Sequence, residues 1–221
     1  MKITISKENY LKAIAEADAE GETVIAATLA RWLNVSPPAV TMAIRRLRRD
    51  DCIAVDPSGH IKLTAEGRRI ADRILHRHHL IERMLVEVFG MEWYKVHDEA
   101  ERLEHAVSED FERLLIRKLG ESQPCVHGNL AEISTPEQRR RRGWQRMDQV
   151  APPSTVTVVS VYERDRQLLE YLDELSVQPG ARVDIVGRNY DETLSLKVGG
   201  NAVQLGASVA GKIWVKADAV V

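Results

Sequence analysis

The chain has 221 residues with a formal net charge of −2; 44% of the residues are hydrophobic and 29% are charged. This composition is typical of a globular protein with an ordinary core, and the near-neutral charge means that any affinity for nucleic acid must come from a local patch. Its two cysteines, Cys52 and Cys125, lie in unrelated contexts and argue against a disulfide framework or a structural zinc ribbon. No apolar run approaches the roughly 18 residues that a membrane span requires, and the N-terminus lacks the apolar segment of a signal peptide. We therefore expect a cytosolic protein without a membrane partner.

The first part of the chain predicts three short helices. Apolar residues with a 3.6-residue period indicate a helix over 6–20, with Ser6 as its N-cap and Gly21 after its end. A second helix is expected over 24–33, and Ser36 precedes a third that begins with two prolines, which are favoured in the first helical turn. Two helices joined by a short turn are the layout of a helix-turn-helix.

The third helix is locally basic. Four arginines and no acidic residue lie between Ser36 and Arg49. Small and apolar residues near its start suit close approach to base edges and thymine methyl groups. Residues 52–63 then predict a hairpin that would act as a wing and contact phosphate. The predicted DNA-contacting residues are Ser36, Pro37, Pro38, Ala39, Thr41, Met42, Arg46, Arg49 and Lys62. The alternative is a solvated basic helix that touches no DNA.

The chain after residue 63 predicts three parts: a helical segment, a linker and a segment of short strands. Three helices with apolar stripes are expected from residue 64 to residue 120, more than a small DNA-binding head requires, so we expect them to dimerise. Residues 121–153, with several prolines and the arginine run 139–142, predict a linker. From residue 155 onward, five short alternating runs predict strands of a small β-barrel, interrupted by a helix over 164–175.

Residues 93–105, taken as a helix, carry a stripe of metal-binding side chains. His97, Glu101, Glu104 and His105 follow the spacing i, i+4, i+7, i+8, which places them on one face. The preceding helix offers a second set with i, i+4 spacing, namely His78 and Glu82. Two imidazoles and two carboxylates on one stripe can chelate a divalent cation, although a solvated charged face is the ordinary alternative.

The order of these motifs resembles a known family. A winged helix, HRHHLIER (76–83), VHDEAERLEHAVS (96–108), CVHG (125–128) and a small β-barrel together resemble the diphtheria toxin repressor family of metal-dependent transcriptional repressors. The resemblance covers essentially the whole chain and implies an α+β protein. Its expected parts are a winged helix-turn-helix DNA-binding domain (1–64), an all-α metal-binding and dimerisation domain (65–140), a linker (141–152) and a small SH3-like β-barrel (153–221).

The resemblance also implies two metal sites per subunit. The ancillary site would use His78, Glu82 and His97, with Glu163 and Asp165 as candidate ligands from the barrel domain. The primary site would use Glu101, Glu104, His105 and Asn9.

The ligand types of the primary site bear on the choice of metal. The iron-responsive branch of the family carries Cys where this chain has Glu101, and the manganese-responsive branch carries a carboxylate there. Because a carboxylate hardens the ligand set, this substitution favours Mn²⁺, with Fe²⁺ as the alternative. Asn9 stands where the manganese branch has Asp and the iron branch has Met. A charged Lys12 cannot ligate, and this argues against a close-spaced binuclear manganese site.

We therefore predict a metal-activated repressor, not an enzyme, that binds double-stranded operator DNA as a homodimer and uses no organic cofactor. One rival is a winged-helix regulator that senses an organic ligand. Another is a metalloenzyme built on the His/Glu helices, which would need an open coordination position and a general base. The sequence shows no nucleophile motif to support the enzyme.

Overall fold

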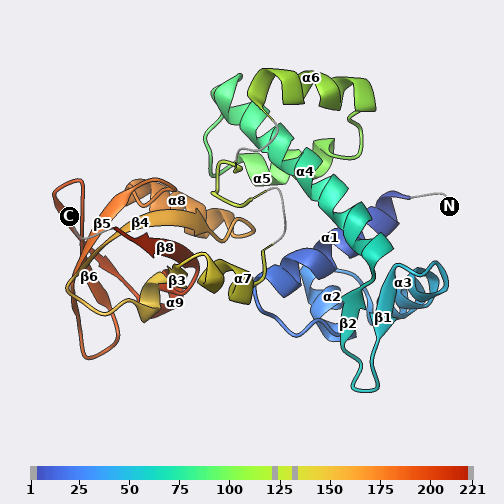
Figure 1. Cartoon of the computed structure of the whole chain (residues 1–221), viewed down its shortest axis with the longest axis horizontal. Helices are drawn as coiled ribbons and strands as arrows, with labels where there is room; N and C mark the ends of the chain where they lie inside the picture. The colour runs from blue at the N-terminus through green and yellow to red at the C-terminus, as the bar shows by residue number, and fades with distance from the viewer. Residues whose placement is uncertain (1–3, 121–123, 131–133, 219–221) are drawn as a thin grey trace.

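The computed structural model describes residues 4–120, 124–130 and 134–218. Figure 1 shows a helical head at the N-terminus, a group of helices around a long central helix, and a β-sheet domain at the C-terminus. The sheet domain and the third helix of the head lie at opposite ends of the long axis (Figure 1). In the described ranges, no helix is long and apolar enough to cross a membrane.

The head is a winged helix. Its elements are α1 (Ile5–Ala19), α2 (Ala26–Leu33), α3 (Pro37–Arg49), β1 (Ile53–Val55) and β2 (Ile61–Leu63). Thr4, rather than Ser6, caps α1, since its hydroxyl accepts a hydrogen bond from the Lys7 backbone N–H. The two strands pair antiparallel, and Leu11, Leu29 and Leu47 meet in a fully buried core.

The middle of the chain forms three helices, α4 (Ala65–Glu87), α5 (Val96–Leu103) and α6 (Glu109–Leu119). Long α4 packs against α1 of the head and also against α5 and α6, so it connects the two parts (Figure 1). The helix predicted over 93–105 is shorter than expected. Glu104 takes its C-cap position and His105 lies in the following turn.

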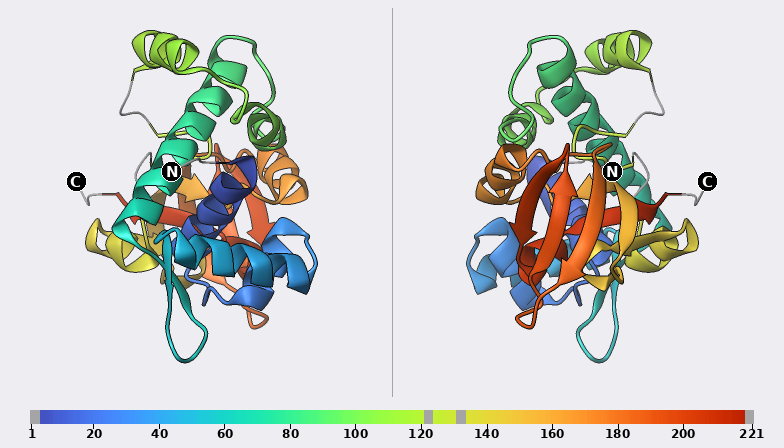
Figure 2. Two further views of the ribbon diagram at one scale, coloured as in Figure 1. Left: turned by 90° about the vertical axis from the view of Figure 1, so that its right-hand side faces the viewer. Right: turned by 90° about the vertical axis from the view of Figure 1, so that its left-hand side faces the viewer.

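The C-terminal domain is built on a six-stranded antiparallel sheet in the order β3-β8-β4-β5-β6-β7 (Figure 2, right). Its strands are β3 (Trp144–Arg146), β4 (Ser154–Val161), β5 (Arg182–Arg188), β6 (Leu194–Val198), β7 (Asn201–Leu205) and β8 (Ile213–Ala217). Helical segments α7 (Pro136–Arg141), η1 (Met147–Gln149), α8 (Arg166–Glu174) and α9 (Ala207–Ala210) complete it.

The sheet has one strand more than the sequence predicts. β3 lies in the expected linker and pairs with β8, with Trp144 opposite Lys216. Three residues are too few to show an alternating pattern. The arginine run is also structured: Thr135 and Gln138 form a capping box that starts α7, and Arg139 is buried.

Candidate metal centre

Helix α4 delivers three potential ligands to the protein interior: His78, His79 and Glu82. His78 and Glu82 stand one helical turn apart, and each has 0% of its surface exposed. A buried carboxylate is costly unless charges or hydrogen bonds compensate it. The surroundings of Glu82 therefore determine what this site can hold.

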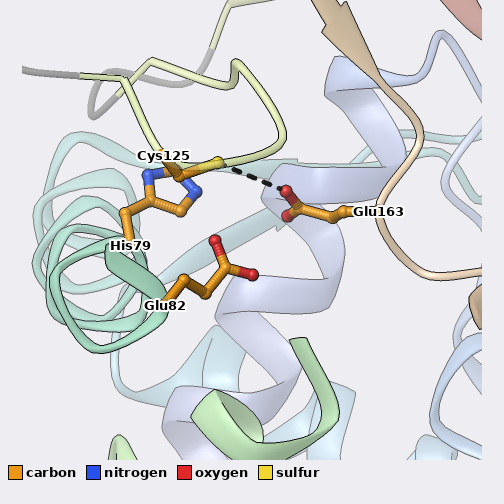
Figure 3. A group of neighbouring side chains, drawn as sticks. All are labelled: His79, Glu82, Cys125 and Glu163. Atoms are coloured by element: carbon orange, nitrogen blue, oxygen red, sulfur yellow. Dashed lines mark hydrogen bonds between the residues drawn. The ribbon is translucent and has the colours of Figure 1, made fainter. Parts of the chain in front are cut away.

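Two groups of ligand-type side chains share Glu82. One consists of His78, Glu82 and His97, and the other of His79, Glu82, Cys125 and Glu163; within each group the ligand atoms lie within 4.8 Å of one another. Figure 3 shows the carboxylates of Glu82 and Glu163 converging beside the His79 ring and the Cys125 sulfur. The groups join α4, α5, the 125–128 turn and the connection from β4 to α8. We call these six side chains together with His127 the interior centre.

One oxygen of Glu82 faces three imidazoles. Oε1 lies 3.1 Å from His78 Nε2, 3.2 Å from His127 Nδ1 and 3.4 Å from His97 Nδ1. Burial alone would raise the pKa of Glu82, but the charges of His127 and His78 hold it well below its usual range. For His78, burial and Lys12 lower the pKa, and the carboxylates of Glu82 and Glu104 outweigh them and raise it to about 9.

The second carboxylate, Glu163, is similarly surrounded. Its Oε2 accepts a hydrogen bond of 2.5 Å from Asn129 and lies 3.7 Å from the Cys125 sulfur. Burial and Glu82 raise the pKa of Glu163, but the nearby histidines lower it to about 2. Burial and the carboxylates of Glu82 and Glu163 raise the pKa of the Cys125 thiol well above its usual value, so Cys125 is a neutral thiol unless a metal ion displaces its proton.

The donor set fits a divalent cation. Oε2 of Glu82 is buried and makes no hydrogen bond in the described residues. The His127 ring donates from Nε2 to the Trp93 carbonyl at 3.0 Å, which leaves Nδ1 directed at Glu82. Likewise His78 Nδ1 lies 2.7 Å from Glu104 Oε2, which leaves Nε2 for the centre. Outer partners of this kind fix the tautomer and orientation of metal-binding histidines.

The 125–128 turn depends on a glycine. Gly128 has a positive φ of 82°, and a Cβ at this position would lie 1.9 Å from the Val159 carbonyl oxygen on β4. The turn is fixed to the same strand because the Val161 N–H donates to the His127 carbonyl at 3.0 Å. Only glycine allows this close approach, so Gly128 positions Cys125 and His127.

We expect Gly128→Ala to displace the turn and to weaken Mn²⁺ binding by about 10- to 100-fold, the usual cost of losing support around metal ligands. Isothermal titration of the metal-free protein would measure this. Gly180→Ala is the matched control, because Gly180 also has positive φ (89°) but its Cβ would meet nothing within 4 Å. Equal metal affinity in the two variants would contradict the role given to the turn.

The residues predicted for the primary site surround an ammonium group. Lys12 Nζ lies 2.8 Å from Glu104 Oε2 and 3.8 Å from Glu101 Oε1. His105 Nδ1 is 2.9 Å from Glu8 Oε2, and its Nε2 lies 3.4 Å from Glu104 Oε1. Asn9 lines a cavity beside Lys12, Glu101 and Glu104.

As they stand, these residues do not fit a metal ion. Among the described side chains, Glu101, Glu104 and His105 are not one of the groups whose ligand atoms converge within 4.8 Å. Burial lowers the pKa of Lys12, but Glu16, Glu104 and Glu101 raise it above its usual value. The position between the carboxylates therefore already carries a positive charge.

Of the five residues predicted for the ancillary site, the structure brings four together and separates one. The structure places His78, Glu82, His97 and Glu163 next to one another. Asp165 does not join them, because its side chain accepts from the Leu168 N–H at 3.1 Å as the N-cap of α8 and lies 3.0 Å from Lys212 Nζ. The helical spacings do not identify His79, Cys125 and His127 as candidate ligands; the Cys-x-His spacing in CVHG is the available signal for the last two.

The predicted DNA-contacting residues are accessible. Met42 is 72% exposed, and α3 faces away from the sheet domain (Figure 1). Arg45, Arg46 and Arg49 line a hollow beside Met42. All the predicted residues are exposed: Ser36, Pro37, Pro38, Ala39, Thr41, Met42, Arg46, Arg49 and Lys62.

Three family models match the chain in order. Residues 2–61 match the iron-dependent repressor N-terminal DNA-binding domain, residues 64–131 match the iron-dependent repressor metal-binding and dimerisation domain, and residues 145–217 match the FeoA domain. The predicted fold class, with its helix-turn-helix, helical and SH3-like β domains, is thus confirmed.

Individual relatives agree with these matches. The iron-dependent repressor IdeR of Mycobacterium tuberculosis (strain ATCC 25618 / H37Rv) is 34% identical over 189 residues, which cover 80% of this chain and 82% of that protein. The diphtheria toxin repressor of Corynebacterium jeikeium (strain K411) is 31% identical over 201 residues, covering 81% and 84%. A solved manganese-dependent transcriptional repressor in complex with manganese superposes with a TM-score of 0.86 at 30% identity, covering 96% of this chain and all of that one. This chain therefore belongs to the diphtheria toxin repressor family of iron- or manganese-dependent transcriptional repressors.

Proposed function

We propose that this repressor binds double-stranded operator DNA as a homodimer when a divalent cation, preferably Mn²⁺, occupies the interior centre. The observation that carries the proposal is the fully buried Glu82, with one oxygen facing three imidazoles and the other without a hydrogen-bond partner in the described residues. The ligands would be drawn from His78, Glu82, His97, Cys125, His127 and Glu163. A bound cation would take over there the positive charge that the surrounding imidazoles otherwise supply to two buried carboxylates.

The centre is connected to the DNA-binding head by two sets of contacts. Arg164 follows Glu163 in the chain and reaches the head, where it lies 2.7 Å from Glu16 of α1 and donates to the Trp32 carbonyl at 3.3 Å. On the other side, His78 contacts Lys12 of α1 directly. Ligand binding that favours one arrangement of these contacts would fix the orientation of α3, and such couplings are typically about 1–3 kcal/mol.

The chemistry of the ligands supports manganese as the first choice. The carboxylates and imidazoles suit a hard to borderline cation, whereas the Cys125 thiol is a softer ligand that favours iron or zinc over manganese. The structural relative with 30% identity is described as a manganese complex. Iron remains the competing metal, because the sequence relatives include proteins named iron-dependent repressors. Affinity alone cannot select manganese, since it stands lowest in the Irving–Williams order.

The same surfaces support the proposed partners. In a dimer the two α3 helices would enter successive major grooves about 34 Å apart. Exposed apolar side chains in and beside the helical domain, Phe89, Phe111 and Leu114, offer a surface for a second copy. The interior centre is buried, which favours a regulatory role over a hydrolytic one that would need access for water and substrate.

The test uses metal-free protein and a DNA duplex selected from a random library with the metal-loaded protein. Anaerobic titrations with Mn²⁺ and with Fe²⁺ are followed by fluorescence anisotropy of the labelled duplex. We expect tight binding only with metal, and half-activation at a lower free concentration of Mn²⁺ than of Fe²⁺. Equal or better activation by Fe²⁺ would transfer the assignment to iron. DNA binding without any metal dependence would overturn the proposal.

A further inference from the structure

Lys12 is an unusual residue for the buried face of a helix. Only 3% of its surface is exposed, so its ammonium group depends on its neighbours for charge compensation. Nζ lies 2.8 Å from Glu104 Oε2, 3.0 Å from His78 Nδ1, 3.8 Å from Glu101 Oε1 and 3.9 Å from Glu16 Oε1. Three carboxylates and an imidazole thus surround one positive charge.

These neighbours come from different parts of the molecule. Lys12 and Glu16 belong to α1 of the head, His78 to α4, and Glu101 and Glu104 to α5 and its C-cap. The ammonium group therefore holds the head against the helical domain. An ammonium group is a compact point charge with three donors, so it can satisfy a shell of oxygens much as a small cation would.

We propose that the Lys12 ammonium group is a built-in cation that takes the place of a metal ion between the head and the helical domain, so that each subunit binds one metal ion, at the interior centre. This inference rests on the proposed function for the interior centre. It departs from the two sites per subunit that the family resemblance implies.

The surrounding groups leave little capacity for a second metal. Arg164 is another fixed cation at the same carboxylates, with Nη1 2.7 Å from Glu16 and 3.3 Å from Glu101. A divalent ion placed there would meet two positive side chains. Of the oxygens around Lys12, Glu16 Oε1 is buried without a hydrogen bond among the described residues and lies 3.9 Å from the ammonium group. His105, which would have to contribute a nitrogen, already has a carboxylate beside each ring nitrogen: Glu8 Oε2 lies 2.9 Å from Nδ1, and Glu104 Oε1 lies 3.4 Å from Nε2.

The arrangement gives Glu104 a positioning role. Its Oε2 accepts from Lys12 Nζ at 2.8 Å and lies 2.7 Å from His78 Nδ1. This interaction directs His78 Nε2 toward the interior centre, where it lies 3.1 Å from both Glu82 and His97. Glu104 thus orients a ligand of the centre, as outer carboxylates commonly do, and needs no metal of its own.

The experiment counts Mn²⁺ per subunit by equilibrium dialysis with elemental analysis, in the full-length chain. We expect one ion in the wild type and two in Lys12→Gln, where the carboxylates lose their internal cation. Lys12→Arg keeps the charge and should remain at one. In Lys12→Gln, adding Glu101→Gln should remove the second ion. Circular dichroism, with thermal unfolding, checks that each variant is folded.

Glu101→Gln alone tests the inference independently of any change at Lys12. Glu101 is 41% exposed at its side chain, so the variant should fold, and we expect its count to stay at one. Two ions in the wild type, falling to one in Glu101→Gln, would overturn the inference and leave the proposed function standing. No bound Mn²⁺ in the wild type would overturn the proposed function. If the wild type binds no Mn²⁺, one ion per subunit in Lys12→Gln would still support the role of Lys12 as a built-in cation. No bound ion in Lys12→Gln would overturn that role together with the proposed function.

Discussion

Replacing Glu82 by glutamine should abolish metal-dependent DNA binding and leave the fold intact. Glutamine keeps the size of the side chain but removes the charge on which three imidazoles converge. Metal affinity should fall by more than about 100-fold, since the loss of a direct ligand exceeds the 10- to 100-fold usual for an outer partner. The neighbouring imidazoles can lose their protons, so the variant need not keep an unpaired buried charge.

The measurement for Glu82→Gln is anisotropy of labelled duplex across a Mn²⁺ titration, with calorimetric metal affinity on the same samples. Glu87→Gln is the matched control, because Glu87 lies on α4 with its side chain 46% exposed and pairs only with Arg83 in the described residues. The control should retain full metal activation. Activation of Glu82→Gln at the wild-type concentration of Mn²⁺ would contradict the assignment of the interior centre.

The second large effect, on DNA affinity, is expected from a substitution on α3, which carries most of the predicted DNA-contacting residues. Arg46 is exposed on α3 and lines a hollow with Met42 and Arg49. An arginine contact to a base is worth about 1–3 kcal/mol. Because a homodimer contains two copies, Arg46→Ala should weaken binding of the metal-loaded protein to its selected duplex by roughly 30- to 20,000-fold.

Anisotropy at several salt concentrations separates the possible roles of Arg46. If Arg46 contacts a base, the variant should lose affinity mainly for the selected duplex. If Arg46 contacts a phosphate, the variant should lose affinity equally for all duplexes, and its binding should depend less steeply on salt. Arg113→Ala provides the control, since Arg113 is an exposed arginine on α6 of the helical domain. Mn²⁺ uptake should be unchanged in both variants. Wild-type affinity in Arg46→Ala would show that α3 binds DNA by another set of residues.

The head could be predicted from sequence because its signals are local. Ser36 and the two prolines that mark the start of α3 are adjacent in the sequence. The two strands of the wing are likewise joined by a recognisable turn, Pro57-Ser58-Gly59. Prediction failed for elements that depend on distant partners. β3 consists of three residues and exists because β8 pairs with it. Helix α5 ends before His105, which has its ring next to Glu8 of the head.

The candidate site was predictable to the extent that its residues share a helix. His78 and Glu82 are neighbours on α4, and their spacing identifies them. Cys125 and His127 come from a turn whose position depends on packing against β4, which no periodicity reveals. Lys12 could be excluded as a ligand from its charge, but the sequence could not show that its ammonium group lies among the carboxylates assigned to the primary site.

The most direct test of the central claim is the position of the bound metal. Crystals of the protein grown with Mn²⁺ would be measured at the manganese absorption edge, where the anomalous difference map locates the ion by the anomalous scattering of manganese itself. We predict one peak per subunit, among Glu82, Glu163 and the histidines of the interior centre. A peak between Glu101, Glu104 and His105, with Lys12 displaced from its carboxylates, would contradict this account.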